Sequence, residues 1–347
     1  LASGLATARY DLATARYDLA TARYDLATAR YDLVFPRYGD RMICGIDVGG
    51  TKTLGVAIDG SGAVTAECRM PTPTTATDLV DTLAAVIAGL EKSTGAPPTA
   101  VGLGIAGIVT ADAVRYSPII PGVIEYPLRA KLADRLGLPV VLGNDANAMA
   151  VAEHRMGAGR GVDDLLLVAL GTGIGTGFIL DGRLYRGAHG FAGEAGHMVV
   201  DRDGPLYHTD ERGPWELFAS GTAFGVLAER LVADGSLPYE PGTAGRSLSA
   251  ELASAPSAAA RAALDEFAAD VALGVRNLIY VLDPARIVLS GGLVEIGETL
   301  RAAVEAAVGR NLLGREHRPA VPVALASLGV ASGAQGAALL AADLSET

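Results

Sequence analysis

Three glycine-rich loops, each directly after a run of apolar residues, constrain the fold of this chain more than any other sequence feature. They occupy residues 47–52, 171–175 and 290–292. Glycine adopts positive φ angles and lets the backbone approach a ligand closely, and N–H groups exposed in such turns can bind anionic oxygens. One glycine-rich loop is most often only a turn, whereas three that follow apolar strands predict a phosphate site assembled from distant segments. The residues expected to bind phosphate are Gly49, Gly50, Thr51 and Lys52; Gly171, Thr172 and Gly173; and Gly291 and Gly292.

The order of the apolar segments predicts an α/β fold with two lobes. Strands separated by glycine turns form a meander near residue 43 and another near residue 165, and strand and helix patterns follow each meander. This repetition suggests two related lobes, and pairs of lobes commonly bind ligands in the cleft between them. We expect strands over 43–48, 54–59, 63–70, 100–105, 139–142, 165–170, 178–180, 183–185, 286–289 and 322–325, and helices over 78–92, 125–136, 146–156 and 331–342.

Two other nucleotide-binding motifs fit less well. A Walker loop requires Gly-x4-Gly-Lys-Ser/Thr; Gly45 and Gly50 have that separation, but Thr51 stands where the lysine is needed. A dinucleotide fingerprint occupies residues 102–107, but residues 108–112 do not begin a clear helix, and no acidic residue ends a following strand about 20 residues further on. Neither a Walker nor a Rossmann fold is therefore expected.

Two acidic residues at strand ends are candidates for metal binding and proton transfer. Asp47 precedes the first glycine loop, where a carboxylate can bind Mg²⁺ directly or through water, and Lys52 can offset phosphate charge. A turn-capping role is the simpler alternative for Asp47. Asn144 and Asp145 end a strand and begin a helix, so Asp145 can accept a proton from an attacking hydroxyl. The alternative for this pair is a helix N-cap, which Asn and Asp form readily.

A second polar cluster lies further along the chain. Glu194 and His197 flank a glycine in an apolar context, and Glu216 lies in the apolar run Trp-Glu-Leu-Phe. A lone histidine is usually structural, but a carboxylate and an imidazole together suit recognition of a polyol. An ionised Glu216 is costly in apolar surroundings without a partner or a ligand.

The charge and composition of the chain argue against several classes of partner. The formal net charge is −11 over 347 residues, whereas nucleic-acid binding favours clustered Lys and Arg. The two cysteines, Cys44 and Cys68, indicate a reducing compartment without a disulfide framework. No charge-free stretch of about 18 apolar residues is present, and no signal peptide is recognisable. We expect a cytoplasmic protein that binds a small polyol, with no nucleic-acid or membrane partner.

Residues 6–33 are tandem copies of Ala-Thr-Ala-Arg-Tyr-Asp-Leu. The seven-residue period keeps the leucines in heptad register, so a coiled coil is conceivable, but the rest of that seam is mostly alanine. We interpret residues 1–41 as a non-native start, or as a disordered or helical extension, and assign them no chemistry.

With these motifs in this order, the sequence resembles the ROK family of sugar kinases, named for repressors, open reading frames and kinases. The resemblance spans about residues 43–342. The segments that carry it are 47–52 (first phosphate motif), 144–148 (Asn-Asp-Ala-Asn-Ala, catalytic segment), 170–175 (second phosphate motif), 194–197 (Glu-x-Gly-His signature) and 283–292 (adenosine segment).

The resemblance implies an actin/hexokinase-like ATPase fold with two ribonuclease H-like lobes, and ATP with Mg²⁺ as cofactors. It implies Asp145 as general base. Family members are commonly dimers or tetramers, and we expect a homodimer. The expected lobes are residues 42–148 with 332–347, and residues 149–331. The expected contacts to the acceptor hydroxyls are Asn144, Asp145, Glu194, His197 and Glu216.

The segment before Glu216 departs from the family pattern. ROK kinases usually carry Cys-x-Cys-Gly-x-x-Gly-Cys-x-Glu there, and the cysteines hold a structural zinc together with the signature histidine. The cysteine positions are Tyr207, Thr209 and Pro214 in this chain. Because zinc prefers ligand sets with thiolates in such sites, we expect no zinc, and we expect Tyr207 and Trp215 to anchor the loop by packing.

A second departure concerns the acceptor. Ile119 occupies a position where glucokinases of this family usually carry a polar Asn, while Thr176 in place of glycine is a mild change. An apolar wall favours a less hydroxylated acceptor, such as a valienone- or valiolone-type C7 cyclitol of aminocyclitol antibiotic biosynthesis, phosphorylated on its CH₂OH group. Glucose and N-acyl-hexosamines stay as alternatives. A ROK-type transcriptional regulator or sugar sensor is a further alternative, but residues 1–41 show no helix-turn-helix pattern.

Overall fold

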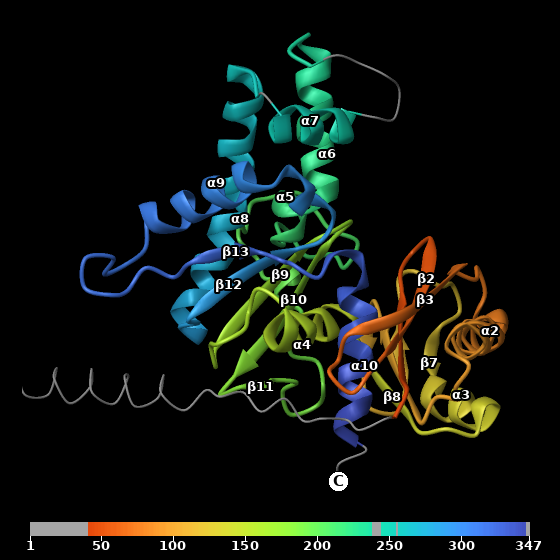
Figure 1. Ribbon diagram of the computed structural model, residues 1–347. Coiled ribbons are helices and arrows are strands. Elements are labelled where there is room, and N and C mark those ends of the chain that lie inside the picture. Colours follow the sequence, from red (N-terminus) through yellow and green to blue (C-terminus); the bar gives the residue numbers. More distant parts are fainter. Residues whose placement is uncertain (1–40, 238–243, 255, 345–347) are drawn as a thin grey trace, which may run out of the picture. The chain divides into compact units, whose positions relative to one another are not determined.

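The computed structural model describes residues 41–237, 244–254 and 256–344, which belong to one compact unit. Residues 1–41, which we interpreted as a non-native start or an extension, lie outside the described part of the chain, apart from Arg41. Within the described part, two five-stranded mixed sheets carry most of the fold (Figure 1). No helix of that part is both long and apolar enough to span a membrane.

The two sheets have the same topology. In the first, the order is β3-β2-β1-β4-β8, with β2 antiparallel to β1 and β3, and with β4 parallel to β1 and β8. In the second, the order β11-β10-β9-β12-β13 repeats this pattern. The predicted pair of meanders is therefore confirmed. The strands are β1 (Ile43–Val48), β2 (Lys52–Ile58), β3 (Val64–Pro71), β4 (Ala100–Ile105), β8 (Val140–Asn144), β9 (Leu165–Leu170), β10 (Ile174–Leu180), β11 (Arg183–Leu184), β12 (Arg286–Ser290) and β13 (Val323–Leu325).

Several helices begin where polar side chains satisfy free backbone N–H groups. Ser220 accepts a hydrogen bond from Ala223 N, and Ser257 accepts one from Ala260 N. The described helices are α2 (Ala76–Thr94), α3 (Leu128–Leu136), α4 (Asp145–Met156), α5 (Glu216–Ala219), α6 (Gly221–Ala233), α7 (Ala244–Ser254), α8 (Ala258–Leu282), α9 (Glu298–Arg310) and α10 (Ser332–Leu344), with short 3-10 helices at Ala195–His197, Gly292–Ile296 and Gly329–Ala331.

A small third sheet corrects one sequence-based prediction. A helix was expected over 125–136, but Ile124–Tyr126 forms strand β7 and α3 begins only at Leu128. Strand β7 pairs with β6 (Val114–Tyr116), which pairs in turn with β5 (Ile108–Val109). Pro127 disfavours a helical conformation of the residue before it, and therefore the helix starts after the proline.

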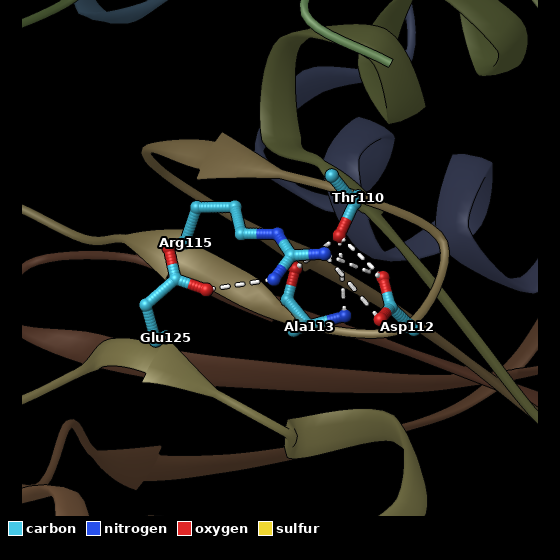
Figure 2. A network of polar contacts seen from close by, with 5 residues as sticks. All are labelled: Thr110, Asp112, Ala113, Arg115 and Glu125. Carbon is cyan, nitrogen blue, oxygen red and sulfur yellow. Dashed lines mark hydrogen bonds and ion pairs between the residues drawn. The ribbon is translucent and has the colours of Figure 1, made fainter. Parts of the chain in front are cut away.

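Ion pairs on the surface of this third sheet connect β6 to β7 and to the turn before β6. Figure 2 shows Arg115 between two acidic side chains, with Nη1 2.7 Å from Glu125 Oε2 and Nη2 3.3 Å from Asp112 Oδ1. Thr110 Oγ1 donates a 2.6 Å hydrogen bond to Asp112 Oδ1. The network holds β6, the strand that carries Tyr116 toward the cavity described below, to β7 and to the turn before β6.

Helix α10 packs against β1, β4 and α4 at very short range. Glycines make this packing possible: a Cβ atom would lie 1.9 Å from Ala334 O at Gly45, 1.8 Å from Ala337 O at Gly102 and 1.7 Å from Ala148 O at Gly336. One buried cluster around α10 joins side chains of both sheets, including Ile43 of β1 and Leu167 of β9. The two sheets thus share part of their core.

Candidate active site

A cavity of about 1450 Å³ is lined by strand ends of both sheets and by loops and helices that follow them. It brings together most of the residues that the sequence singled out. The predicted residues that line it are Gly49, Gly50, Thr51, Asn144, Asp145, Gly171, Thr172, Gly173, Glu194, His197, Glu216 and Gly291. Asp47, Lys52 and Gly292 do not contribute to its lining.

The first glycine loop is the hairpin turn between β1 and β2. Gly49 N donates to Lys52 O at 3.1 Å, and Thr72 Oγ1 donates to Gly49 O at 2.6 Å. Thr72 N also donates to Thr51 O at 3.2 Å. Thr72 was not expected from the sequence, because only the pairing of β3 with β2 brings it to the loop. Gly50 and Thr51 are exposed at the cavity.

The second glycine loop is shorter than predicted. Residues 171–175 were expected to form it, but β10 begins at Ile174, which pairs with Leu170. Gly175 has a different role: a Cβ atom there would lie 2.9 Å from Ala146 Cβ of α4. The remaining turn is held by Gly171 N, which donates to Gly173 O at 3.1 Å, and by Gly221 N, which donates to Gly171 O at 2.7 Å.

The third glycine loop follows β12. Gly291 has φ 89°, and a Cβ atom there would lie 2.5 Å from Leu170 O, so the loop passes close to the end of β9. Gly292 begins a 3-10 helix and lies outside the cavity lining. The second and third loops therefore meet at one end of the second sheet.

Asn144 is the N-cap of α4, as its simpler interpretation predicted. Its Oδ1 accepts a 3.1 Å hydrogen bond from Asn147 N, and its Nδ2 donates to Gly107 O at 3.2 Å. Asp145 is the first residue of the helix, and its Oδ1 accepts from Ala146 N at 2.9 Å. Capping and a place at the cavity are compatible, because the helix N-terminus itself faces the cavity.

The carboxyl groups of Asp47 and Asp145 both have raised pKa values. Burial, then the nearby Asp145 carboxylate, raise the pKa of Asp47 to about 7, while the charge of Lys52 opposes the shift. Burial raises the pKa of Asp145, and backbone N–H groups partly offset it. A raised pKa makes a carboxylate a stronger base, and two buried carboxylates that repel each other suit a cation between or beside them.

The described residues fit Mg²⁺ only in combination with another ligand. No group of three or more His, Cys, Asp or Glu side chains in this part of the chain could hold a metal ion alone. Mg²⁺ is usually bound by one or two carboxylates together with water and substrate phosphates. Asp47, in β1 directly before the first glycine loop, could provide such a carboxylate.

Glu194 and His197 also line the cavity, at the short 3-10 helix Ala195–His197, which Glu194 directly precedes. Glu194 Oε2 is 3.9 Å from His197 Nε2. Burial raises the pKa of Glu194, His197 opposes the shift, and Asp145 and Glu216 reinforce it. The turn before Glu194 is fixed by Thr176, whose Oγ1 donates to Gly193 O at 2.6 Å.

Glu216 has two protein partners. Its Oε2 accepts a 2.9 Å hydrogen bond from Ile174 N, and its Oε1 accepts one from the Tyr207 hydroxyl. Trp215, one of the two expected packing anchors of the preceding loop, is fully buried, and its Nε1 donates to Asp270 O at 2.9 Å. Tyr207, the other, is only partly buried and lines the cavity. The absence of zinc stays a prediction.

Apolar side chains line the cavity beside the first glycine loop and Asp145. They come from the third sheet and the turn after β6, and they are Ile108, Tyr116, Pro118 and Ile119. A Cβ atom at Gly50 would lie 3.9 Å from Ile119 Cγ2. Ile119 therefore borders the first glycine loop, and the expected apolar wall is present.

The cavity also extends between α6 and α8, which the sequence did not indicate as part of the site. The lining there includes Thr222, Ala223, Val226, Leu227, Arg230, Glu266, Phe267 and Asp270. Thr222 Oγ1 donates to Thr172 O at 2.7 Å, and Arg230 Nη2 lies 2.6 Å from Glu266 Oε1. None of the sequence motifs falls on these residues, so no signal singled them out.

The paired sheets, with glycine loops and carboxylates at a shared cavity, define a two-lobed ATPase fold of the actin/hexokinase type. The chain belongs to the ROK family, whose model matches residues 43–344. It is 34% identical to a glucokinase of Streptomyces coelicolor over 87% of this chain and 98% of the relative. It is 33% identical to an N-acetylgalactosamine kinase of Shewanella sp. over 86% and 96% of the two chains.

A solved structure agrees with this assignment. The ROK family glucokinase from Streptomyces griseus, in complex with glucose and AMPPNP, is 35% identical and has a TM-score of 0.78. The match covers 87% of this chain and 99% of that chain. Family and fold are thus those that the sequence motifs predicted.

Proposed function

We propose that this protein transfers the γ-phosphoryl group of ATP to a hydroxyl of a sugar or a sugar-like cyclitol. The observation that carries the proposal is the position of Asp145: a carboxyl with a raised pKa lies in one cavity with the glycine loops and with Glu194 and His197. A glucokinase and an N-acetylgalactosamine kinase among the relatives support the same class of reaction.

The proposed roles follow from the chemistry of phosphoryl transfer. Asp145 accepts the proton of the attacking hydroxyl, and the N–H groups of Gly50 and Gly173 stabilise the phosphate oxygens. Asp47, together with the phosphates, would hold Mg²⁺, and the ion would supply positive charge against the developing negative charge. Asn144, Glu194 and His197 orient the acceptor hydroxyls, together with Glu216. Gly291 and the surface between α6 and α8 bind the adenosine.

For the acceptor we propose a primary CH₂OH group on a ring with an apolar side. Ile119 borders the first glycine loop, and Tyr116 and Pro118 extend the apolar wall. A less hydroxylated ring, such as that of a valienone-type C7 cyclitol, suits this wall better than glucose does. The glucokinase and N-acetylgalactosamine kinase relatives favour a hexose instead, so both acceptor classes need to be tested.

A coupled assay of ADP release tests the proposal directly. Glucose, mannose, N-acetylglucosamine, N-acetylmannosamine, N-acetylgalactosamine and C7 cyclitols are compared at equal concentration with Mg²⁺ and ATP. We expect acceptor-dependent turnover, with kcat/KM highest for a cyclitol. ADP release that no polyol stimulates would contradict the kinase assignment and favour a sensor. A hexose as the best substrate would contradict only the cyclitol preference.

The variant Asp145→Asn tests the proposed base. It removes the proton acceptor but keeps the size of the side chain, so we expect kcat to fall by about 10² to 10⁴. AMPPNP should bind within about twofold of wild type, which corresponds to less than about 0.5 kcal/mol. Turnover close to wild type would show that another group accepts the proton.

The resemblance to ROK kinases also leads us to propose a homodimer in the cytoplasm. Light scattering at several protein concentrations tests the oligomeric state. A single monomeric mass at all concentrations would contradict the dimer.

A further inference from the structure

The loop over residues 198–214 is tied to the second glycine loop through one carboxylate. Its backbone is fixed at both ends, because Trp215 N donates to Met198 O at 2.8 Å and Gly213 N donates to Pro205 O at 2.9 Å. It is a tight double turn: Gly213 has φ 63°, and a Cβ atom there would lie 1.7 Å from Asp201 O. Tyr207 lies at the cavity end of this loop.

The carboxylate is Glu216, the residue directly after Trp215. Its Oε2 accepts from Ile174 N and would be 2.1 Å from a Cβ atom at Gly173, so it fills the space beside that glycine. Its Oε1 accepts from the Tyr207 hydroxyl. Each oxygen therefore has one fixed donor, which sets the plane of the carboxylate and leaves further lone pairs directed elsewhere.

The surroundings of Tyr207 also restrict its motion. Its ring centroid lies 5.8 Å from that of His197 and 3.9 Å from that of His208. Tyr116, from the opposite apolar wall, is close enough to contribute to the raised pKa of the Tyr207 hydroxyl, after burial and Glu216. The hydroxyl consequently remains protonated and donates its hydrogen bond throughout the neutral pH range.

We propose that Tyr207 is a positioning residue that acts through Glu216 on the Gly173–Ile174 end of the second glycine loop, and so couples the acceptor side of the cavity to phosphate binding. This inference rests on the proposed nucleotide site. Tyr207 stands at a position where the family pattern has a cysteine, and its hydroxyl provides a link to Glu216 that uses no metal ion. Because the link ends on a phosphate-binding loop, its loss should weaken the binding of phosphate groups more than the binding of the nucleoside.

The test compares Tyr207→Phe, Glu216→Ala, the double variant and wild type by calorimetric titration with Mg²⁺–AMPPNP and with adenosine. Tyr207→Phe removes one charge-assisted hydrogen bond, so we expect AMPPNP affinity to fall about tenfold and adenosine affinity to change less than about twofold. Glu216→Ala should lower the affinity for AMPPNP at least as much. In the Glu216→Ala background, Tyr207→Phe should add almost nothing, because residues that act through one another are not additive.

Two further variants separate positioning from a general loss of structure. Tyr185→Phe is the matched control, because Tyr185 is 49% exposed and lies outside the cavity lining; its AMPPNP affinity should equal that of wild type. Glu216→Gln can still accept from Ile174 N and should lose less affinity than Glu216→Ala. Melting temperatures of all variants show whether each one is folded.

Two results would overturn the inference. One is an equal loss of adenosine and AMPPNP affinity in Tyr207→Phe, and the other is a full additional loss when this change is made in the Glu216→Ala background. Failure of the proposed function would look different: no polyol would stimulate ADP release, while the AMPPNP and adenosine results would stand as expected.

Discussion

At the scale of single residues, the site is organised around two carboxyl groups from different strands. Asp47 is the penultimate residue of β1, and Asp145 follows the end of β8, with β4 between these strands in the sheet. Each could be selected from the sequence as a strand-end acid. The effect of Asp145 on Asp47 could not be predicted from the sequence, because it depends on strand order and on burial. Burial and the Asp145 carboxylate together raise the pKa of Asp47 to about 7.

The raised pKa of Asp47 makes the stability of the free protein depend on pH. Between the ordinary pKa of 3.8 and about 7, the folded state retains a proton that the unfolded state has lost, so the free energy of unfolding decreases as pH rises through this range. Asp47→Asn removes this dependence. We expect the variant to be more stable than wild type at pH 8, with a difference that shrinks toward pH 4, as measured by urea unfolding without nucleotide.

Asp59→Asn is the control for this experiment, because its pKa is shifted in the opposite direction. Hydrogen bonds from Ser61 and Ala63 lower the pKa of the exposed Asp59 carboxyl. This variant should be less stable than wild type at pH 8, and the difference should disappear as pH falls through the lowered pKa. A destabilised Asp47→Asn at pH 8 would show that its carboxylate is favourably paired.

At the scale of elements, glycines have two physically different roles that look alike in the sequence. Gly291 adopts a positive φ beside the cavity, whereas Gly175 and Gly336 allow a helix to approach a strand or another helix. A pattern of glycines after a strand cannot distinguish these roles. The register of β10 against β9 places Gly175 in the strand and not in the loop. For this reason the second loop was predicted too long.

Gly336→Ala tests the close packing of α10 on α4. A Cβ atom at Gly336 would lie 1.7 Å from Ala148 O, so the helices must separate, and overpacking of this kind costs about 1–3 kcal/mol. We expect a lower midpoint of urea unfolding with an unchanged slope. Because α4 carries Asp145 at its start, we also expect a lower kcat.

Gly309→Ala in α9 is the matched control, because no atom lies within 4 Å of a Cβ atom placed there. Alanine favours a helix over glycine by up to about 1 kcal/mol, so this variant should be as stable as wild type or more stable. If Gly336→Ala were as stable as Gly309→Ala, α10 would have to pack more loosely on α4 than it does in the structure.

At the scale of the whole molecule, the cavity depends on both sheets, so a ligand that binds it should stabilise the folded chain as a unit. A ligand present at about 100 times its Kd adds about 2.7 kcal/mol to the free energy of unfolding. We expect Mg²⁺–AMPPNP to raise the melting temperature, and EDTA to reduce the increase because the phosphates lose their cation. A melting temperature unaffected by AMPPNP would contradict a nucleotide site in this cavity.

A zinc chelator provides an independent test on the free protein. Tyr207, Thr209 and Pro214 occupy the positions of the family's cysteines, so 1,10-phenanthroline should leave the melting temperature unchanged. A clear decrease would reveal a structural metal site that the chain forms with other ligands.

The sequence by itself determined the α/β class, the duplicated meander and the loops, because strand periodicity and glycine turns are local properties. The motifs also indicated the family. Tertiary structure alone decided that β7 replaces the start of a predicted helix, that Thr72 supports the first loop, and that α6 and α8 line the cavity. These features depend on contacts between residues far apart in the chain. The three glycine loops were recognisable as separate turns, but only the pairing of strands brings them to one cavity.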